Sequence, residues 1–318
     1  MELQEIRGLA ERIRENVAQV IVGKEDAIEL MLIALITGGH VLLEDVPGTG
    51  KTLLAKTLAR SLDCSFKRIQ FTPDLLPSDV SGINFYNQKS GEFEFRAGPL
   101  FANIVLADEI NRATPRTQSS LLEAMEERQV SVDGETRLLP EPFLVIATQN
   151  PVENQGTFPL PEAQLDRFLL KLSMGYPSTE EGVELLRRFK ERNPLAAVVP
   201  VAGREQLLAA GKAYARVRVD DDLLRYLVEI AEKTRSHPEL SLGASPRGTQ
   251  ALLRSAQALA IVRGRDYVLP DDIKRLAVPV LAHRLVPRNR MRSAAGGAEQ
   301  ILERILADTA VPAEAATR

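Results

Sequence analysis

The stretch from residue 41 to residue 52, VLLEDVPGTGKT, decides the fold of this chain, because it reads as a buried strand, a glycine-bearing loop and the start of a helix. That layout is typical of a phosphate-binding P-loop. Backbone N–H groups of the loop would hold an anion at a helix amino end, where the helix dipole favours negative charge. Lys51 would reach the β- and γ-phosphates, and the Thr52 hydroxyl would bind Mg²⁺. The residues predicted to hold the nucleotide here are Pro47, Gly48, Thr49, Gly50, Lys51 and Thr52.

The loop departs from the usual pattern at its first position. Asp45 stands where a leading glycine is expected, and Glu44 precedes it. Two carboxylates at this place would repel phosphate unless both side chains point away from it. The alternative interpretation is a glycine-rich turn before an ordinary helix, but PGTGKT directly after an apolar strand disfavours it.

A second apolar strand ends in a pair of acids. Residues 104–109 read IVLADE, some fifty residues after the P-loop. Asp108 is placed to hold Mg²⁺ through water, and Glu109 to activate the attacking water. Alone, such a pair is equally compatible with a solvated turn after a buried strand. A third apolar strand, FLVIATQN at residues 143–150, ends in the polar Asn150. Together with the P-loop, these strands predict nucleoside triphosphate hydrolysis.

The composition excludes several classes of function. The chain has 318 residues, enough for about two domains, and a formal net charge of −3, which disfavours a large basic surface for nucleic acid. The single cysteine, Cys64, cannot form an internal disulfide, and the three histidines are scattered along the chain. The amino terminus lacks the regions of a secretion signal, and no apolar run reaches about eighteen residues. We therefore expect no membrane insertion and a cytoplasmic protein.

The order of elements predicts two parts. Alternating helices and strands up to residue 176 indicate an α/β nucleotide-binding domain whose parallel sheet is covered by helices. From residue 177 to 318 the pattern changes to helices, predicted at 179–192, 205–216, 221–234, 246–263 and 271–283. Two segments interrupt the first part as β-hairpins, INFYNQKSGEFEFRAG and QVSVDGETRLL, and the second carries a two-residue Asp133-Gly134 turn. The final residues from Ala310 are expected to be mobile.

These motifs stand in the order found in AAA+ ATPases. ADEINRA at 107–113, IATQNP at 146–151, LPEAQLDRF at 160–168 and GASPRG at 243–248 resemble the MoxR family most closely, over nearly the whole chain. The resemblance implies a P-loop AAA+ core, residues 1–176, with a helix-2 insert and a pre-sensor-1 hairpin. Residues 177–318 would form a small all-helical lid and a tail. The family tolerates an acidic residue at the first P-loop position, as Asp45 is here.

The same resemblance implies roles for residues outside the two phosphate motifs. Asn150 is similar to sensor 1, Arg167 to the arginine finger and Arg247 to sensor 2, whereas Val22 and Gly23 resemble the segment beside adenine. Each has a structural alternative. Asn150 could be a turn residue, Val22-Gly23 a core turn, and Arg167 a surface arginine paired with Asp166, worth only ~0–1 kcal/mol. Whether Arg247 acts within its own subunit or across an interface stays open.

The function implied by the resemblance is an ATPase that forms a ring, usually a hexamer, and remodels other proteins. Its cofactors would be ATP and Mg²⁺, and its partner a protein with a von Willebrand factor A domain. Chaperone-like maturation or metal-cofactor insertion would be the outcome. A nucleic-acid motor of the helicase type is the alternative, which the net charge disfavours, and a non-catalytic nucleotide switch is a third. The aromatic side chains of the first hairpin, Phe85, Tyr86, Phe93 and Phe95, would contact substrate or form a buried face.

Overall fold

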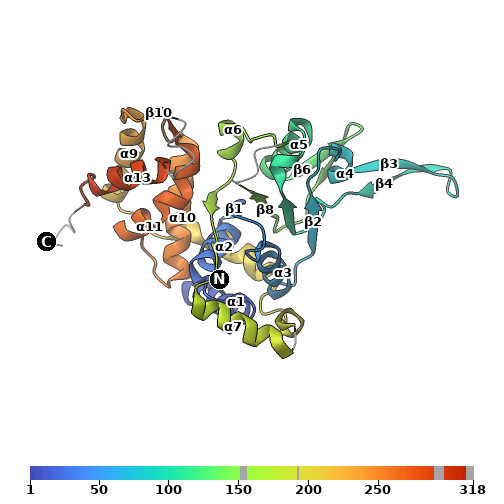
Figure 1. Cartoon of the computed structure of the whole chain (residues 1–318), viewed down its shortest axis with the longest axis horizontal. Helices are drawn as coiled ribbons and strands as arrows, with labels where there is room; N and C mark the ends of the chain where they lie inside the picture. Colours follow the sequence, from blue (N-terminus) through green and yellow to red (C-terminus); the bar gives the residue numbers. More distant parts are fainter. Residues whose placement is uncertain (151–155, 192, 290–296, 313–318) are drawn as a thin grey trace.

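A five-stranded parallel sheet forms the centre of the molecule (Figure 1). The computed structural model describes residues 1–150, 156–191, 193–289 and 297–312. In their order across the sheet, the strands are β2 (Phe66–Gln70), β5 (Ile104–Asp108), β8 (Leu144–Gln149), β1 (Val41–Glu44) and β9 (Leu170–Leu172). All neighbouring strands are parallel, which confirms the predicted α/β class. The carboxyl ends of β5, β8 and β1 therefore lie side by side at one edge of the sheet.

Both faces of the sheet are buried, because alternate strand residues enter two separate apolar cores. Leu43 belongs to one core and its neighbour Leu42 to the other. The core on the Leu43 side includes residues of α1 (Leu3–Ala18), α2 (Glu25–Thr37) and α3 (Lys51–Ser61). The core on the Leu42 side includes residues of α4 (Pro77–Ser81) and α5 (Pro115–Glu127). The short helix α6 (Glu162–Leu165) and the 3-10 turn η1 (Ile110–Arg112) lie in connections around the sheet.

Helix α2 ends where the sequence changes from a long apolar run to two glycines. Gly38 caps the helix with φ at 64°, a left-handed conformation that costs glycine nothing. His40, directly before β1, is buried and connects the start of β1 to β8 and α5. Its Nδ1 accepts from the Val145 N–H at 2.9 Å, and its Nε2 lies 3.0 Å from the Met125 carbonyl. Burial lowers the His40 pKa to about 3, so the ring is neutral.

Both predicted hairpins form. The first comprises β3 (Gly82–Asn87) and β4 (Glu92–Ala97), and the second β6 (Gln129–Val132) and β7 (Glu135–Leu138). The first extends away from the body, at the end of the molecule opposite the carboxy-terminal helices (Figure 1). Its aromatic side chains do not form a buried face: Phe93 is 75% exposed and Tyr86 54% exposed. Only Phe95 is half-buried, against Phe101 and beneath the Arg137 guanidinium.

Helices dominate the chain after residue 176, as predicted. They are α7 (Thr179–Glu191), α8 (Arg204–Ala213), α9 (Asp221–Ser236), α10 (Pro246–Val262), α11 (Pro270–Leu281) and α13 (Gly297–Ala307), with 3-10 turns η2 (Pro194–Ala197), η3 (Tyr214–Arg216) and η4 (Ala282–Arg284). The expectation of helices alone is wrong in one detail, because β10 (Leu240–Leu242) and β11 (Val286–Pro287) pair as a short antiparallel ribbon. Residue 192 of the first predicted helix, and the tail from residue 313, lie outside the described residues.

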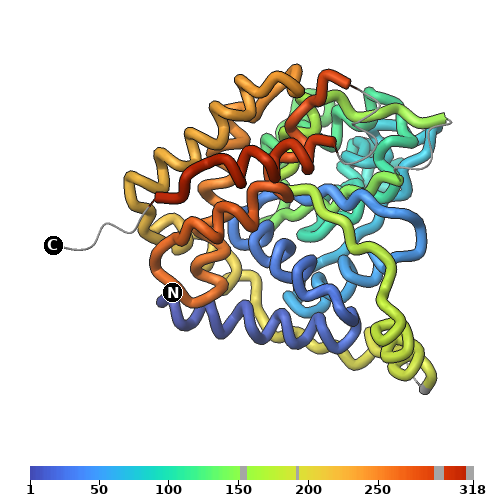
Figure 2. The backbone as a smooth tube through the Cα atoms, turned by 60° about the vertical axis from the view of Figure 1, so that its left-hand side comes forward, coloured from blue at the N-terminus to red at the C-terminus, as the bar shows by residue number. Residues whose placement is uncertain are grey.

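The carboxy-terminal helices pack directly on the amino-terminal ones. Helix α10 contacts both α1 and α2, which Figure 2 shows as orange and blue segments that lie together. Side chains from all three helices belong to one apolar core, so the boundary expected at residue 176 is not a boundary between cores. Among the described helices, none is long and apolar enough to cross a membrane.

Candidate nucleotide site

The loop after β1 has the conformation that a phosphate cradle needs. Gly48 and Gly50 have φ of 86° and 93°, and no heavy atom lies within 4 Å of the place where a Gly48 Cβ would stand. Helix α3 begins at Lys51, so its free amino end points into the loop. The Lys51 Nζ donates to the Asp45 carbonyl at 2.8 Å, so its ammonium group lies at the loop where the phosphates would bind. This arrangement can bind an anion through backbone N–H groups and one cation.

The two acids before the loop are turned away from it. The buried Asp45 side chain accepts three backbone N–H groups: Oδ2 from Met174 at 2.8 Å and from Gly175 at 3.0 Å, and Oδ1 from Val46 at 3.0 Å. Glu44 pairs with Lys171 at 2.6 Å. Both carboxylates are thus occupied by other partners, so the repulsion between them and a bound phosphate that was considered from the sequence does not arise. Asp45 instead links the loop to the residues that follow β9.

The acid pair lies beside the loop, at the same edge of the sheet. Asp108 accepts from the Thr148 hydroxyl at 2.6 Å and pairs with Arg68 at 2.6 Å. Glu109 has φ of 56° and ψ of 50°, a left-handed conformation that is strained for a residue other than glycine. Its Oε2 accepts from Gln70 at 2.7 Å. The Glu109 carboxylate also pairs with Arg112 at 3.2 Å, and Gln70 accepts from the Arg68 that pairs with Asp108, so both acids belong to one hydrogen-bonded network.

Asn150 follows β8 directly and is buried. Because β8 lies between β5 and β1, Asn150 stands between Glu109 and the P-loop, as expected for a residue that contacts the γ-phosphate. Pro151, which ends the predicted IATQNP motif, lies outside the described residues.

The predicted magnesium ligands, Thr52 and Asp108, suit a cation shared with phosphate. Thr52 lies in the first turn of α3, and Asp108 ends the neighbouring motif strand. Within the described part of the chain, no group of three or more His, Cys, Asp or Glu side chains is placed to hold a metal. Mg²⁺ typically takes one or two protein oxygens together with phosphate oxygens and water, and this donor set fits that habit.

Arg167 and Arg247 lie at the opposite edge of the sheet. Strand β9 begins at Leu170 beside Val41, and the Leu169 N–H donates to the His40 carbonyl at 2.8 Å, so Arg167 precedes the strand starts. One strand of four residues separates this edge from the P-loop, roughly 13 Å at about 3.3 Å per residue. Both arginines pair with Glu126, Arg167 through Nε at 3.0 Å and Arg247 through Nη2.

Asp166 has other partners than the neighbouring arginine. It accepts from the Arg284 Nε at 2.8 Å and from the Ser245 hydroxyl. The alternative in which Arg167 pairs with Asp166 is therefore wrong. Arg247 lies on the first turn of α10, after the capping Ser245 and Pro246.

Comparison with known proteins places the chain among AAA+ ATPases. Residues 40–170 match the model described as "ATPase family associated with various cellular activities (AAA)", and residues 232–305 match the AAA lid domain. The uncharacterized protein YeaC of Bacillus subtilis is 51% identical over 98% of this chain and 97% of that protein. Chaperone MoxR1 of Mycobacterium tuberculosis is 44% identical over 95% of this chain and 82% of that protein. The chain belongs to the MoxR family of AAA+ ATPases.

A solved structure agrees with this assignment. A crystal structure of a protein assigned as an ATPase, from Cytophaga hutchinsonii, superimposes with a TM-score of 0.91 at 41% identity, over 98% of this chain and 97% of that one. The MoxR-family chain accordingly has a P-loop AAA+ core with a helical lid, and its activity is ATP hydrolysis.

The segment predicted to lie beside adenine, Val22-Gly23, connects to the P-loop through a short series of contacts. Asp45 holds Met174 and Gly175, and the next carbonyl, that of Tyr176, accepts from the Lys24 Nζ at 3.2 Å. Gly23 precedes Lys24, with φ of 66°. A Cβ on Gly23 would stand 1.8 Å from the Glu181 Oε1, so a larger residue would have to adopt the left-handed conformation and displace the Glu181 side chain.

Three site residues escaped the sequence reasoning: Arg68, Gln70 and Thr148. Arg68 and Gln70 are two residues apart on β2 and so share a face, and Thr148 is a fully buried polar residue that follows four apolar residues in β8. These polar residues can be assigned to the site only once β2 and β8 are known to flank β5, the strand that ends in Asp108.

Proposed function

We propose that this MoxR-family ATPase works as a ring in which each copy completes the nucleotide site of its neighbour. The observation that carries the proposal is the position of Arg167 and Arg247 at the strand starts, away from the P-loop of their own chain. An arginine there can stabilise transition-state charge only on a nucleotide that a second copy presents. A finger supplied in trans is worth about 10³–10⁵ in rate in related NTPases. A hexamer is the arrangement usual for the family.

Within one copy, the residues at the strand ends would perform hydrolysis. Lys51 binds the β- and γ-phosphates, and the loop N–H groups orient them. Thr52 and Asp108 would hold Mg²⁺, which supplies positive charge to the phosphate oxygens. Glu109 takes the proton of the attacking water, and Asn150 orients that water against the γ-phosphate. Val22 and Gly23 would contact the adenine side.

The first experiment tests this assignment in the single chain. Lys51→Ala should lose ATP binding, because the phosphates lose their main cation. Glu109→Gln should bind ATP and hydrolyse it very slowly, since the base is removed while the loop remains. Fluorescent-nucleotide titration and steady-state phosphate release measure the two effects. Comparable turnover by wild type and Glu109→Gln would reject the role of Glu109.

The second experiment tests the shared site. Arg167→Ala should bind ATP yet hydrolyse it poorly. Mixing it with Lys51→Ala should restore part of the activity, because some interfaces then pair an intact arginine with an intact P-loop. Sedimentation velocity with ATP gives the number of copies. Full-rate hydrolysis by a monomer, with Arg167→Ala unaffected, would reject the ring.

We further propose that the ring remodels partner proteins through its two hairpins. The exposed Tyr86 and Phe93 on the first hairpin, and the 77% exposed Leu138 on the second, support a docking role, as does the chaperone name of a relative. The partner class implied by the family is a protein with a von Willebrand factor A domain, with metal-cofactor insertion as one outcome. A pull-down with the 87–91 turn replaced by Gly-Ser, in ATP and in ADP, tests this. Capture that is indifferent to both changes, or recovery of nucleic acid alone, would reject it.

A further inference from the structure

The two interface arginines line a cavity that carries an excess of positive charge. The cavity, about 260 Å³ in volume, lies beside the starts of β1 and β9. Five arginines line it, against two carboxylates, those of Glu126 and Asp166. This excess of positive charge favours the binding of an additional anion. A polyphosphate group on a second molecule that docks at the cavity would be such an anion.

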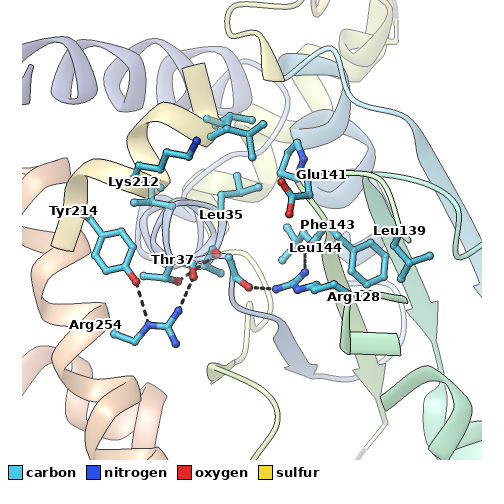
Figure 3. Close-up of a pocket in the computed structure, with 17 residues that line it drawn as sticks. Leu35, Thr37, Arg128, Leu139, Glu141, Phe143, Leu144, Lys212, Tyr214 and Arg254 are labelled. Atoms are coloured by element: carbon cyan, nitrogen blue, oxygen red, sulfur yellow. Dashed lines mark hydrogen bonds between the residues drawn. The ribbon is translucent and has the colours of Figure 1, made fainter. Parts of the chain in front are cut away.

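Three of the five arginines are fixed by backbone carbonyls. Arg128 donates to the carbonyls of Gly38 and Phe143, and Arg254 donates to the Thr37 carbonyl at 3.1 Å and to the Tyr214 hydroxyl at 3.0 Å, as Figure 3 shows in the adjoining pocket. Arg284 is buried and donates to the Phe168 carbonyl at 2.7 Å and to Asp166. These three therefore hold the fold together and cannot turn toward a new anion without breaking it.

Arg167 and Arg247 are held differently. Among the described residues, neither side chain donates to a backbone carbonyl, and both are held by the single carboxylate of Glu126, one on each oxygen. All three groups are accessible: Arg167 is 31%, Glu126 33% and Arg247 49% exposed at the side chain. A carboxylate and a phosphate present the same sign of charge and similar acceptor oxygens to a guanidinium. Glu126 therefore offers the two arginines the same kind of acceptor that a phosphate would offer them.

We propose that Glu126 is a stand-in for the neighbour's γ-phosphate, a positioning residue that holds Arg167 and Arg247 until a copy carrying ATP displaces it. This inference rests on the proposed action of both arginines in trans. In the free subunit Glu126 keeps the two guanidinium groups together at the cavity mouth. When the ring closes on ATP, the arginines pass to the phosphate and Glu126 loses its ionic partners. Glu126 therefore competes with ATP at the interface and sets the ATP concentration at which the ring forms.

The test removes the charge of Glu126 and keeps its shape. Glu126→Gln should lower the ATP concentration for half-maximal hydrolysis by roughly three- to tenfold, since two partly exposed ion pairs no longer compete. The kcat at saturating ATP should stay near that of wild type, because the arginines then contact phosphate in both proteins. The matched control is Glu127→Gln, an exposed neighbour with the same change of charge. Thermal melting by circular dichroism checks that both variants fold.

A second measurement does not depend on turnover. In the Glu109→Gln background, sedimentation velocity should show Glu126→Gln assembling at a lower ATP concentration than its parent, by the same factor. Adding Arg167→Ala and Arg247→Ala should abolish that difference, because Glu126 acts only through these two side chains. A purely structural Glu126 would instead give the same shift with and without the arginines.

Three results would overturn the inference. One is a lower kcat in Glu126→Gln with an unchanged ATP concentration for half-maximal hydrolysis, which would mean that Glu126 orients the arginines inside the working ring. Another is equal behaviour of the Glu126→Gln and Glu127→Gln variants. If Arg167→Ala and Arg247→Ala hydrolyse ATP at the full rate, the trans role itself fails, and the stand-in fails with it. The first two results leave the proposed function intact.

Discussion

Replacing Asp45 by alanine should destabilise this chain far more than an ordinary surface mutation, although the P-loop pattern expects no side chain at that position. The carboxylate accepts N–H groups from Val46, Met174 and Gly175. Hydrogen bonds to a charged group contribute about 1.5–3 kcal/mol each. Three at the low end give about 4.5 kcal/mol, and some relaxation of the loop reduces the expected loss to about 4 kcal/mol.

The loss converts into a measurable shift of the melting temperature. At about 2.1 cal/mol/K per residue, a chain of 318 residues has an unfolding entropy of about 0.7 kcal/mol/K, so about 4 kcal/mol corresponds to about 6 °C. Glu44→Ala is the matched control. It removes the adjacent acid, whose half-buried but solvent-accessible pair with Lys171 is worth about 0–1 kcal/mol, or less than about 2 °C.

Thermal unfolding followed by circular dichroism would measure both variants, with ATP binding measured alongside. Asp45→Ala should also bind ATP more weakly, because the Met174 side chain lies next to the Gly50 backbone and loses its anchor. A melting temperature for Asp45→Ala within about 2 °C of the Glu44→Ala value would show that the three hydrogen bonds do not carry this stability.

Two further predictions concern the buried His40 and the left-handed Gly23. The His40 pKa, lowered to about 3 by burial, means that the unfolded chain binds a proton below about pH 6.5 that the native chain does not. Stability should therefore fall by about 2 kcal/mol between pH 7 and pH 5 on account of His40, and urea midpoints should show a flatter pH dependence in His40→Gln. Gly23→Ala should cost about 1–2 kcal/mol, because its φ is 66° and Glu181 fills the Cβ position. Gly182→Ala, in open space on α7, should be neutral or stabilising in the same melt, and equal effects of the two would contradict this reasoning.

The sequence was most informative where a function is carried by consecutive residues. The P-loop and the acid pair each follow an apolar strand, so their place at the strand ends could be predicted before the sheet order was known. The orientation of Asp45 could not, because its partners Met174 and Gly175 lie about 130 residues away. The Glu126 pairing with Arg247 likewise joins residues 121 apart, and nothing in the local pattern around either residue indicates the other.

The first hairpin shows a second limit of prediction from the sequence. Alternation of aromatic and polar residues predicted the strands of the first hairpin correctly, because the period of two is a backbone property. It could not say whether the aromatic face is covered, since that depends on what lies above the hairpin. Phe93 and Tyr86 are exposed because the hairpin extends beyond the body of the molecule.

The packing of α10 on α1 and α2 makes each copy mechanically stiff. Leu252 of α10 and Ile33 of α2 are fully buried members of one apolar core, and separating these helices would expose such side chains at about 25 cal/mol per Å². A hinge between the two parts of one chain is therefore costly to open. In the proposed ring the copies would meet at the partly exposed Arg167 and Arg247, where relative movement would cost less than inside a chain, so the assembly would change shape by shifts between rigid subunits.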